Sequence, residues 1–296
     1  MRKLFFLIAV LIFFPLAKIH AAFTPDIGAR GAVVGAQNLL VAPPIPSLEV
    51  GGRATFSPQI GYETAKVDGR DVQNNNTLIY SGSLTGYSAG VGLTAPTSGR
   101  LGWFLILVGN SVSGDIDVTD PSISAKLTDL NSKAFAGAGG FSYRFIGESR
   151  SPFAAGVFLG PAAMKISSSF KVIIEAPGFS PTEYSMDETI YGAYGGLQVK
   201  WRFDKVVINP YALYMRELSP ECKKMTVSNS GAFQGMCESD PNAINSVTMK
   251  SSFGGFGLIL GYKNLRFNVY SKALADASFD DLKVTNYSLS YAFGLD

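Results

Sequence analysis

The stretch TIYGAYGGLQVKWRFD, residues 189–204, alternates in character from one residue to the next. Its odd-numbered positions from 191 to 203 carry tyrosine, alanine, glycine, leucine, valine, tryptophan and phenylalanine. Its even-numbered positions from 192 to 202 carry glycine, tyrosine, glutamine, lysine and arginine. Successive side chains of a β-strand point to opposite faces, so the pattern predicts a strand with one apolar side and one mostly polar side.

The same alternation recurs from residue 51 to the end of the chain. Ten segments show it, and each reaches the roughly 9–11 residues that a tilted strand needs to cross a bilayer. Pro58 and Pro161 fall inside two of them, where we expect bulges or shifted boundaries because proline cannot donate to a strand ladder. The predicted strands cover about 51–64, 79–94, 101–111, 133–145, 153–166, 188–203, 206–216, 247–262, 265–274 and 284–295.

The connections between these segments alternate between short and long. The short ones are 95–100, 146–152, 204–205 and 263–264, and the long ones are 65–78, 112–132, 167–187 and 217–246, with 275–283 of moderate length. Barrels that cross an outer membrane have tight turns on one side and extended loops on the other. The fold class predicted is therefore all-β, a transmembrane antiparallel up-and-down β-barrel of about ten strands. The run FKVII, residues 170–174, either extends a hairpin above the membrane or adds two strands, which would give twelve.

The N-terminus has the features of an export signal. Arg2 and Lys3 precede an apolar run from Leu4 to Leu16, and small residues follow at positions 21 and 22. The run is short for a membrane-spanning helix and suits the core of a signal peptide. We therefore divide the chain into a signal peptide over 1–22, a periplasmic or plug-like segment over 23–50 and a barrel over 51–296.

Composition and charge agree with export into a membrane. Charged residues make up only 16% of the chain and aromatics 12%, which is a low charge content for a soluble protein. Without residues 1–22 the basic residues fall from 25 to 22 against 23 acidic ones, so nothing in the net charge suggests nucleic acid as a partner. The one histidine, His20, is also removed with the signal peptide.

Aromatic residues stand at the strand ends beside the short turns. Outer-membrane barrels place such residues in girdles at the two membrane interfaces. The residues assigned to the girdle on the short-turn side are Trp103, Trp201, Phe203, Tyr262 and Phe293.

With these features the chain resembles the small bacterial outer-membrane β-barrel proteins, a porin-like superfamily of Gram-negative bacteria, over about residues 51–296. The last strand, YSLSYAFGL, is similar to the assembly signal of such proteins, although they usually end on an aromatic residue and this chain adds Gly294, Leu295 and Asp296. The resemblance implies a location in the bacterial outer membrane. It also implies membrane lipid, lipopolysaccharide and the barrel-assembly machinery as partners. The barrel enzymes of comparison use histidine as a base, so we expect no enzyme and no cofactor.

The polar faces of the predicted strands indicate what lines the lumen. They place Arg53, Arg144, Lys200, Arg202 and Arg266 in the periplasmic third of the barrel. Glu63 and Glu188 fall toward the outer mouth, and the face between is largely glycine, alanine, serine and threonine. One interpretation is a constriction that passes small polar or anionic solutes. The other is a charge network that closes a small barrel.

Cys222 and Cys237 lie in the longest predicted loop, and in an oxidising compartment we expect them to form a disulfide. Asp115, Asp117 and Asp120 offer the oxygen ligands that calcium requires, but acidic residues of loops are ordinarily solvated, and we predict no metal site.

Three functions follow as hypotheses. The first is a narrow channel for small polar or anionic solutes. The second is a non-conducting barrel that acts through its outer loops. The third is a transporter of apolar ligands, suggested by a faint similarity of residues 28–36 (GARGAVVGA) to the N-terminal hatch of fatty-acid transporter barrels.

Overall fold

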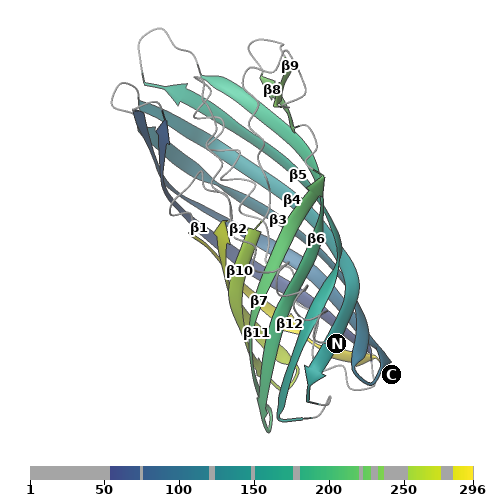
Figure 1. The fold of residues 1–296 in the computed structure, drawn as a ribbon. Helices are drawn as coiled ribbons and strands as arrows, with labels where there is room; N and C mark the ends of the chain where they lie inside the picture. The colour runs from purple at the N-terminus through teal and green to yellow at the C-terminus, as the bar shows by residue number, and fades with distance from the viewer. Residues whose placement is uncertain are drawn as a thin grey trace.

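A computed structural model gives the fold, which is a closed antiparallel β-barrel (Figure 1). Within the described ranges no helix is long and apolar enough to span a membrane. The structure describes residues 54–73, 76–119, 124–147, 151–175, 181–219, 223–227, 233–236, 253–274 and 283–295.

Ten strands form the ring. Each pairs with the ring strands next to it in the chain, and β12 pairs with β1 to close the circle. A short strand, β13 (Phe293–Leu295), continues β12 along β1, and a hairpin of β8 (Lys223–Val227) and β9 (Phe233–Met236) is attached to β6. The ring strands are β1 (Ala54–Gln73), β2 (Asn76–Ser98), β3 (Leu101–Thr119), β4 (Ser124–Ile146), β5 (Phe153–Ile174), β6 (Thr182–Phe203), β7 (Val206–Ser219), β10 (Phe253–Tyr262), β11 (Leu265–Leu274) and β12 (Lys283–Tyr291).

The strands are staggered around the ring. Following paired residues once round the barrel leads from Leu197 of β6 back to Ser185 of the same strand, a displacement of twelve residues. Strand number and stagger together fix the tilt and diameter of a barrel, and eight strands already leave an interior that side chains can fill. Ten strands leave slightly more room, which large side chains occupy in this protein.

The prediction of ten strands is confirmed, and the short turns fall where the sequence placed them. The two-residue turns Asp204–Lys205 and Lys263–Asn264 each begin with a residue in the left-handed region, at φ 51° for Asp204 and 52° for Lys263. For β1–β6, however, the sequence prediction ended the strands too early on the side away from the short turns. Strands β1–β6 are 19 to 23 residues long, whereas β10–β12 have 9 or 10. The run 170–174 is the end of β5, so the extended hairpin was the correct alternative.

Strands β1–β6 therefore continue well beyond the part of the barrel that all ten strands share, and we call the continuation the extension (Figure 1). Its amphipathic pattern is inverted. On the lower part of β3, Leu105 and Leu107 face outward. On the upper part the outward positions are serine and aspartate, whereas Val112, Ile116 and Val118 face inward and are buried. The expectation of an apolar outer face thus holds for the lipid-facing band and fails above it. The expectation of a polar inner face fails on β3 even within the band, where Phe104, Ile106 and Val108 face inward and are buried.

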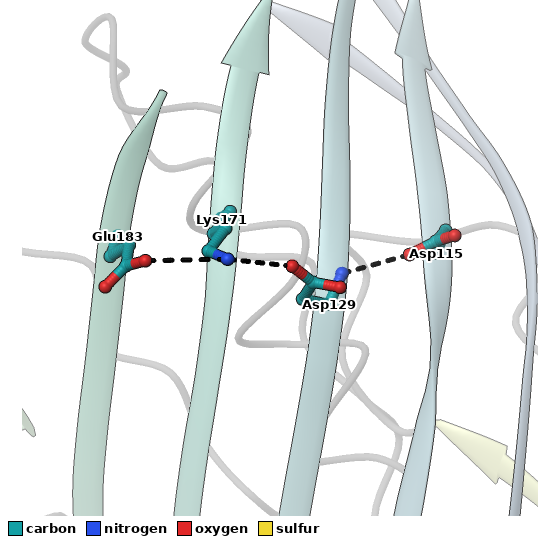
Figure 2. A network of polar contacts seen from close by, with 4 residues as sticks. All are labelled: Asp115, Asp129, Lys171 and Glu183. Carbon is teal, nitrogen blue, oxygen red and sulfur yellow. Dashed lines mark hydrogen bonds and ion pairs between the residues drawn. The ribbon is translucent and has the colours of Figure 1, made fainter. Parts of the chain in front are cut away.

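The outer face of the extension carries a row of charged groups across four strands (Figure 2). The Asp129 backbone N–H donates to the Asp115 carboxylate at 3.1 Å. Lys171 lies 3.0 Å from the carboxylate of Asp129 and 3.6 Å from that of Glu183. These contacts raise the pKa of Lys171, chiefly through its hydrogen bond to Asp129. Exposed pairs of this kind contribute little to stability. A row of charged side chains on this face nevertheless identifies the face as water-exposed.

The two strand prolines lie where a ladder is interrupted. Pro58 of β1 lies opposite the break between β12 and β13. Between β4 and β5 the pairing passes from Ala138–Ala162 to Phe141–Leu159, which skips Pro161. Since proline has no N–H to donate, both positions suit a closed barrel without a free edge. The register of the pairing is the same on either side of each proline, so neither proline marks the expected bulge.

Candidate functional site: the barrel lumen

The lumen has two walls of different chemistry. The wall formed by β1, β2, β11 and β12 is the more polar one, and its buried polar side chains include Gln59, Glu63, Ser88, Asn268, Asn286 and Ser288. The wall formed by β3–β7 is apolar at the same depth. The period-two pattern of each strand decides which of its residues face inward, and the closed ring brings the two walls together.

Glu63 is the charged residue of the polar wall and is 1% exposed. Its carboxylate accepts hydrogen bonds from the side-chain amides of Asn110 and Asn286, each at 3.0 Å. The other side of the Asn110 amide accepts a hydrogen bond from the backbone N–H of Ala134 at 3.1 Å. A buried carboxylate is costly unless hydrogen bonds compensate for lost water, so these two asparagines stabilise Glu63 and join β12, β1 and β3.

Two tyrosines cover the next part of the lumen. The Tyr211 hydroxyl donates to the Asn268 side-chain oxygen at 2.9 Å, and the Asn268 amide donates to Ser288 at 3.3 Å. The rings of Tyr211 and Tyr270 are stacked, with centroids 6.1 Å apart and an interplanar angle of 3°. Tyr211 thus ties the polar wall to β7 over the inner face of β10.

Glycines of β10 make room for these rings. A Cβ atom on Gly257 would lie 2.2 Å from the Tyr211 ring, and one on Gly255 would lie 2.4 Å from the Tyr270 hydroxyl. Both distances are far below van der Waals contact. Glycine is therefore required at these positions because the aromatic rings lie flat on the inner face of β10.

The apolar wall is packed. Phe104, Phe158 and Tyr194 contact one another with ring centroids 5.2 to 6.4 Å apart. The cavity between Ile106 and Tyr194 measures only about 30 Å³. Close packing of this kind is typical of protein interiors. The buried cluster comprises Phe104, Ile106, Ala134, Ala138, Phe158, Met164, Ile166, Ile190, Tyr194, Tyr211, Leu213, Met215 and Tyr270.

This cluster corrects the expectation that small polar residues line the middle of the lumen. The sequence contained a signal for it, because residues 102–109 are apolar on both faces and the inward positions of 206–216 include Tyr211, Leu213 and Met215. Which of these side chains meet across the lumen depends on the stagger of the barrel, which the sequence pattern does not specify.

The predicted basic residues lie near the periplasmic turns, but they do not form one ring. The Arg144 guanidinium donates to the carbonyl of Gly99 in the β2–β3 turn at 3.4 Å. The Arg266 guanidinium donates to the carbonyls of Lys263 and Leu265, the latter at 3.0 Å. These two arginines thus bind turn carbonyls at the rim.

Lys200 and Arg202 are inward-facing residues of β6. Lys200 is fully buried, and Arg202 is partly buried beside the β4–β5 turn, where its backbone N–H donates to the Pro152 carbonyl at 2.7 Å. Glu188 pairs with Ile166 in the ladder between β6 and β5, far above these cations. Arg53, Cys222 and Cys237 lie outside the described residues, so the constriction and the disulfide remain predictions.

The girdle residues lie on the outer face. Trp103, Trp201, Phe203, Tyr262 and Phe293 are 38 to 61% exposed, and each lies close to a short turn or the barrel end. Phe153 packs against Trp201 with ring centroids 5.6 Å apart. Side chains of this size at this level suit the interface between lipid and water.

Asp115 and Asp117, two of the three acidic residues considered for calcium, lie on the outer face of β3, and Asp120 lies outside the described residues. Asp115 is bound to the Asp129 backbone N–H, and Asp117 is 3.8 Å from Lys126. No group of three or more potential metal ligands occurs in the part of the chain that the structure describes.

Solved structures share this architecture. The outer membrane protease OmpT from Escherichia coli matches with a TM-score of 0.54 over 86% of this chain and 99% of that chain, at 10% sequence identity. This chain has the fold of a bacterial outer-membrane β-barrel. Outer-membrane protein OprG from Pseudomonas aeruginosa matches at a TM-score of 0.41 and 14% identity, over 84% of this chain and 100% of that chain. A major outer membrane protein from Thermus thermophilus matches at 0.40 and 10%, over 81% and 99%.

No protein-family model and no curated protein matches the outer-membrane barrel described here. At such low identity the solved structures show the fold alone. OmpT is a protease, and a shared fold argues neither for nor against catalysis. The expectation of a non-enzyme therefore stays a prediction based on the histidine content of the mature chain.

Proposed function

We propose that this outer-membrane barrel does not conduct solutes and instead anchors a folded extension at the cell surface. The observation that carries the proposal is the packed lumen, where the buried cluster fills the apolar wall and Tyr211 and Tyr270 lie over β10. A solute passage needs continuous hydrated space along the barrel axis. A cavity of about 30 Å³ has room for about one water molecule, and its apolar walls offer that molecule no hydrogen bonds.

The extension supports a role outside the membrane. Six strands continue past the lipid-facing band, and the described side chains of β3–β5 in this part form a mostly polar outer face with buried apolar side chains inside. One bulge in β4, between Thr128 and Asn131, shifts the register of its pairing with both β3 and β5 and bends this part of the sheet. Hydrogen bonds within the sheet hold the outer surface of the extension more rigidly than a loop would be held.

Planar-bilayer recording tests the proposal. Purified mature protein is expected to produce no conductance steps, and a Tyr211→Ala/Tyr270→Ala variant, which empties the lumen beside β10, is expected to produce them. Regular steps from the wild-type protein would contradict the proposal and favour the narrow channel. If neither protein conducts, the lumen is closed by more than these rings and the non-conducting role still stands.

The inner face of the extension favours apolar-ligand binding as a second candidate function. Ile116, Leu127, Leu130 and Phe170 are at most 2% exposed and all face inward there. An apolar ligand would enter such an interior readily. Saturable binding of a fluorescent fatty acid, lost in a Phe170→Asp variant, would support this candidate, whereas binding no greater than that of empty micelles would reject it.

A further inference from the structure

The periplasmic end of the barrel carries a strong excess of positive charge. In the described short turns and the strand ends beside them, seven residues are basic and one, Asp204, is acidic, which leaves a net charge of +6. An excess of this size at one end of a molecule favours association with an anionic partner. The basic residues of this end are Arg100, Arg144, Lys200, Arg202, Lys205, Lys263 and Arg266.

The neighbouring parts of the chain do not balance this charge. Residues 23–53, which precede β1, contain two acidic and two basic residues. Residues 148–150, between β4 and β5, add one acidic and one basic residue. Asp296 adds one negative charge, so the sum of +6 falls only to +5. The excess is therefore left for another molecule to neutralise.

Two of the arginines face the mouth of the lumen. Arg202 and Arg266 are half-buried inward residues of β6 and β11, and Val207 and Gly261 connect them in one row of the ladder. Neighbouring strands are about 4.8 Å apart, so three steps separate the two arginines by about 14 Å along the wall. The bilayer surrounds the outside of a barrel and does not reach this row.

Two lysines of adjacent turns are held together at the rim. The Lys263 backbone N–H donates to the Lys205 carbonyl at 2.8 Å, and both side chains are exposed. The Lys263 ammonium lies 5.7 Å from the centroid of the Tyr262 ring, at the outer edge of the rim. Like charges on neighbouring strands are destabilising when they lie opposite each other, so the pair of lysines does not serve the fold.

The backbone at Lys263 supports the same conclusion. Its φ of 52° lies in the left-handed region, at the first position of a two-residue turn. Asparagine, aspartate and glycine are favoured at this position, and the neighbouring turn has Asp204 there, at φ 51°. A lysine in such a conformation costs stability, and residues of this kind concentrate at functional sites.

We propose that the periplasmic mouth binds an acidic, extended segment of a periplasmic protein. Side chains two residues apart on an extended chain lie about 7 Å apart on one face, so carboxylates four residues apart span about 14 Å. This span matches the separation of Arg202 and Arg266. Lys205 and Lys263 then contact further carboxylates where the segment leaves the mouth. The proposal does not depend on whether the barrel conducts solutes.

The chemistry of the arginines suits this partner. Clusters of arginine recognise acidic segments, and each guanidinium can bind a carboxylate through two hydrogen bonds. Arg266 already donates to the carbonyls of Lys263 and Leu265. A guanidinium has five N–H donors, so Arg266 can keep these carbonyls and bind a carboxylate as well. Because the cations are spread over several turns, a segment with several carboxylates contacts more of them than one small anion does.

Fluorescence anisotropy of a dye-labelled peptide of alternating glutamate and serine tests the proposal, with the refolded mature chain in neutral detergent. Wild-type protein is expected to bind this peptide, more weakly as salt rises, and not to bind the same peptide with glutamine in place of glutamate. Arg202→Gln/Arg266→Gln is expected to weaken binding about tenfold, about a factor of three for each arginine. Lys205→Gln/Lys263→Gln is expected to weaken it about fourfold, about a factor of two for each lysine.

A matched control separates this site from general electrostatic attraction. Lys133→Gln/Lys165→Gln removes two exposed lysines from the outer face of β4 and β5, far from the short turns, and should bind the peptide as the wild type does. Heat-dependent gel mobility reports whether each variant folds. Equal binding by the wild type and both mouth variants would overturn the proposal, and so would an equal loss in the control.

Three competing partners are outcomes of the same test. Displacement of the peptide by acetate at the same concentration of carboxylate groups would show a site for small anions and overturn the proposal. Retention of the protein on purified cell-wall sacculi without binding of the peptide would assign the charge to an anionic polymer instead. Retention on phosphatidylglycerol vesicles, lost in the lysine variant and kept in the arginine variant, would assign it to lipid.

Discussion

Arginine placed at two outward positions of β3 should have very different effects on stability. Leu105 lies in the middle of the outward apolar run of this strand, and Ser113 lies on the same face in the extension. Arginine at the bilayer midplane of a barrel costs about 2–4 kcal/mol, and the cost falls to about 0–1 kcal/mol toward the interfaces. Leu105→Arg should therefore lower the free energy of unfolding by about 2–4 kcal/mol, and Ser113→Arg should change it by less than about 0.5 kcal/mol.

An inward substitution above the membrane completes this test. Ile116 is fully buried on the inner face of β3, three residues beyond Ser113. Removing a buried isoleucine side chain costs about 2–5 kcal/mol, so Ile116→Ala should destabilise the protein by that amount although it lies outside the bilayer. A uniform barrel with a wet interior predicts almost no effect at this position.

The assay is reversible guanidinium unfolding in phospholipid vesicles, followed by the fluorescence of Trp103 and Trp201 at the interface. Linear extrapolation gives the free energy of unfolding of each variant. A cost of about 2 kcal/mol or more for Ser113→Arg, or less than about 1 kcal/mol for Ile116→Ala, would refute the inversion of the two faces.

Three further outcomes follow. Gly257→Ala should destabilise the barrel by about 1–3 kcal/mol in the same unfolding assay, because its Cβ would overlap the Tyr211 ring. The same substitution should cost far less in a protein that already carries Tyr211→Ala. Asn286→Leu should cost about 1.5–3 kcal/mol through the lost hydrogen bond to buried Glu63, and a shift under about 0.5 kcal/mol would count against that network. Because the pKa of Lys171 is raised, its ion pairs stabilise the protein fully at neutral pH, and this stabilisation is lost only as the pH rises beyond the ordinary pKa of 10.5. The difference in the free energy of unfolding between wild type and Lys171→Met should therefore be constant from about pH 7 to 10 and shrink above pH 10.

The sequence predicted the periplasmic half of the barrel well, because the membrane imposes a strict pattern there. Lipid-facing residues must be apolar and turns must be short, so the beginnings of β3, β5 and β11 and the turn after Phe203 were located to the residue. Inward and outward positions of residues 189–204 were also correct, from Lys200 inside to Trp201 outside.

The extension could not be found in the same way. Its strands still alternate, but they carry aspartates, serines and glycines on the outside, which is also the composition of a loop. Asp129, with φ 54°, lies in the bulge of β4, where the inward residues shift from even to odd numbers between Leu130 and Leu127. A pattern that changes both polarity and phase within a few residues does not predict a strand.

The candidate site was predicted in part. Arg144, Lys200, Arg202 and Arg266 are near the periplasmic end as expected. The guanidinium groups of Arg144 and Arg266 donate to turn carbonyls, and the position of these carbonyls depends on the backbone and not on the strand pattern. The partners of Glu63 come from β3 and β12, which only the closed ring brings together.

Spin-label accessibility along β3 tests the central claim most directly. Single nitroxide labels at positions 103 to 118, with both native cysteines replaced by serine, are measured against oxygen in the lipid and a nickel chelate in the water. We expect labels at 103, 105 and 107 to respond to oxygen, labels at 111, 113 and 117 to respond to nickel, and labels at 106, 112 and 116 to respond to neither. Strong nickel accessibility at 106, 112 and 116 would show a water-filled interior and contradict the account.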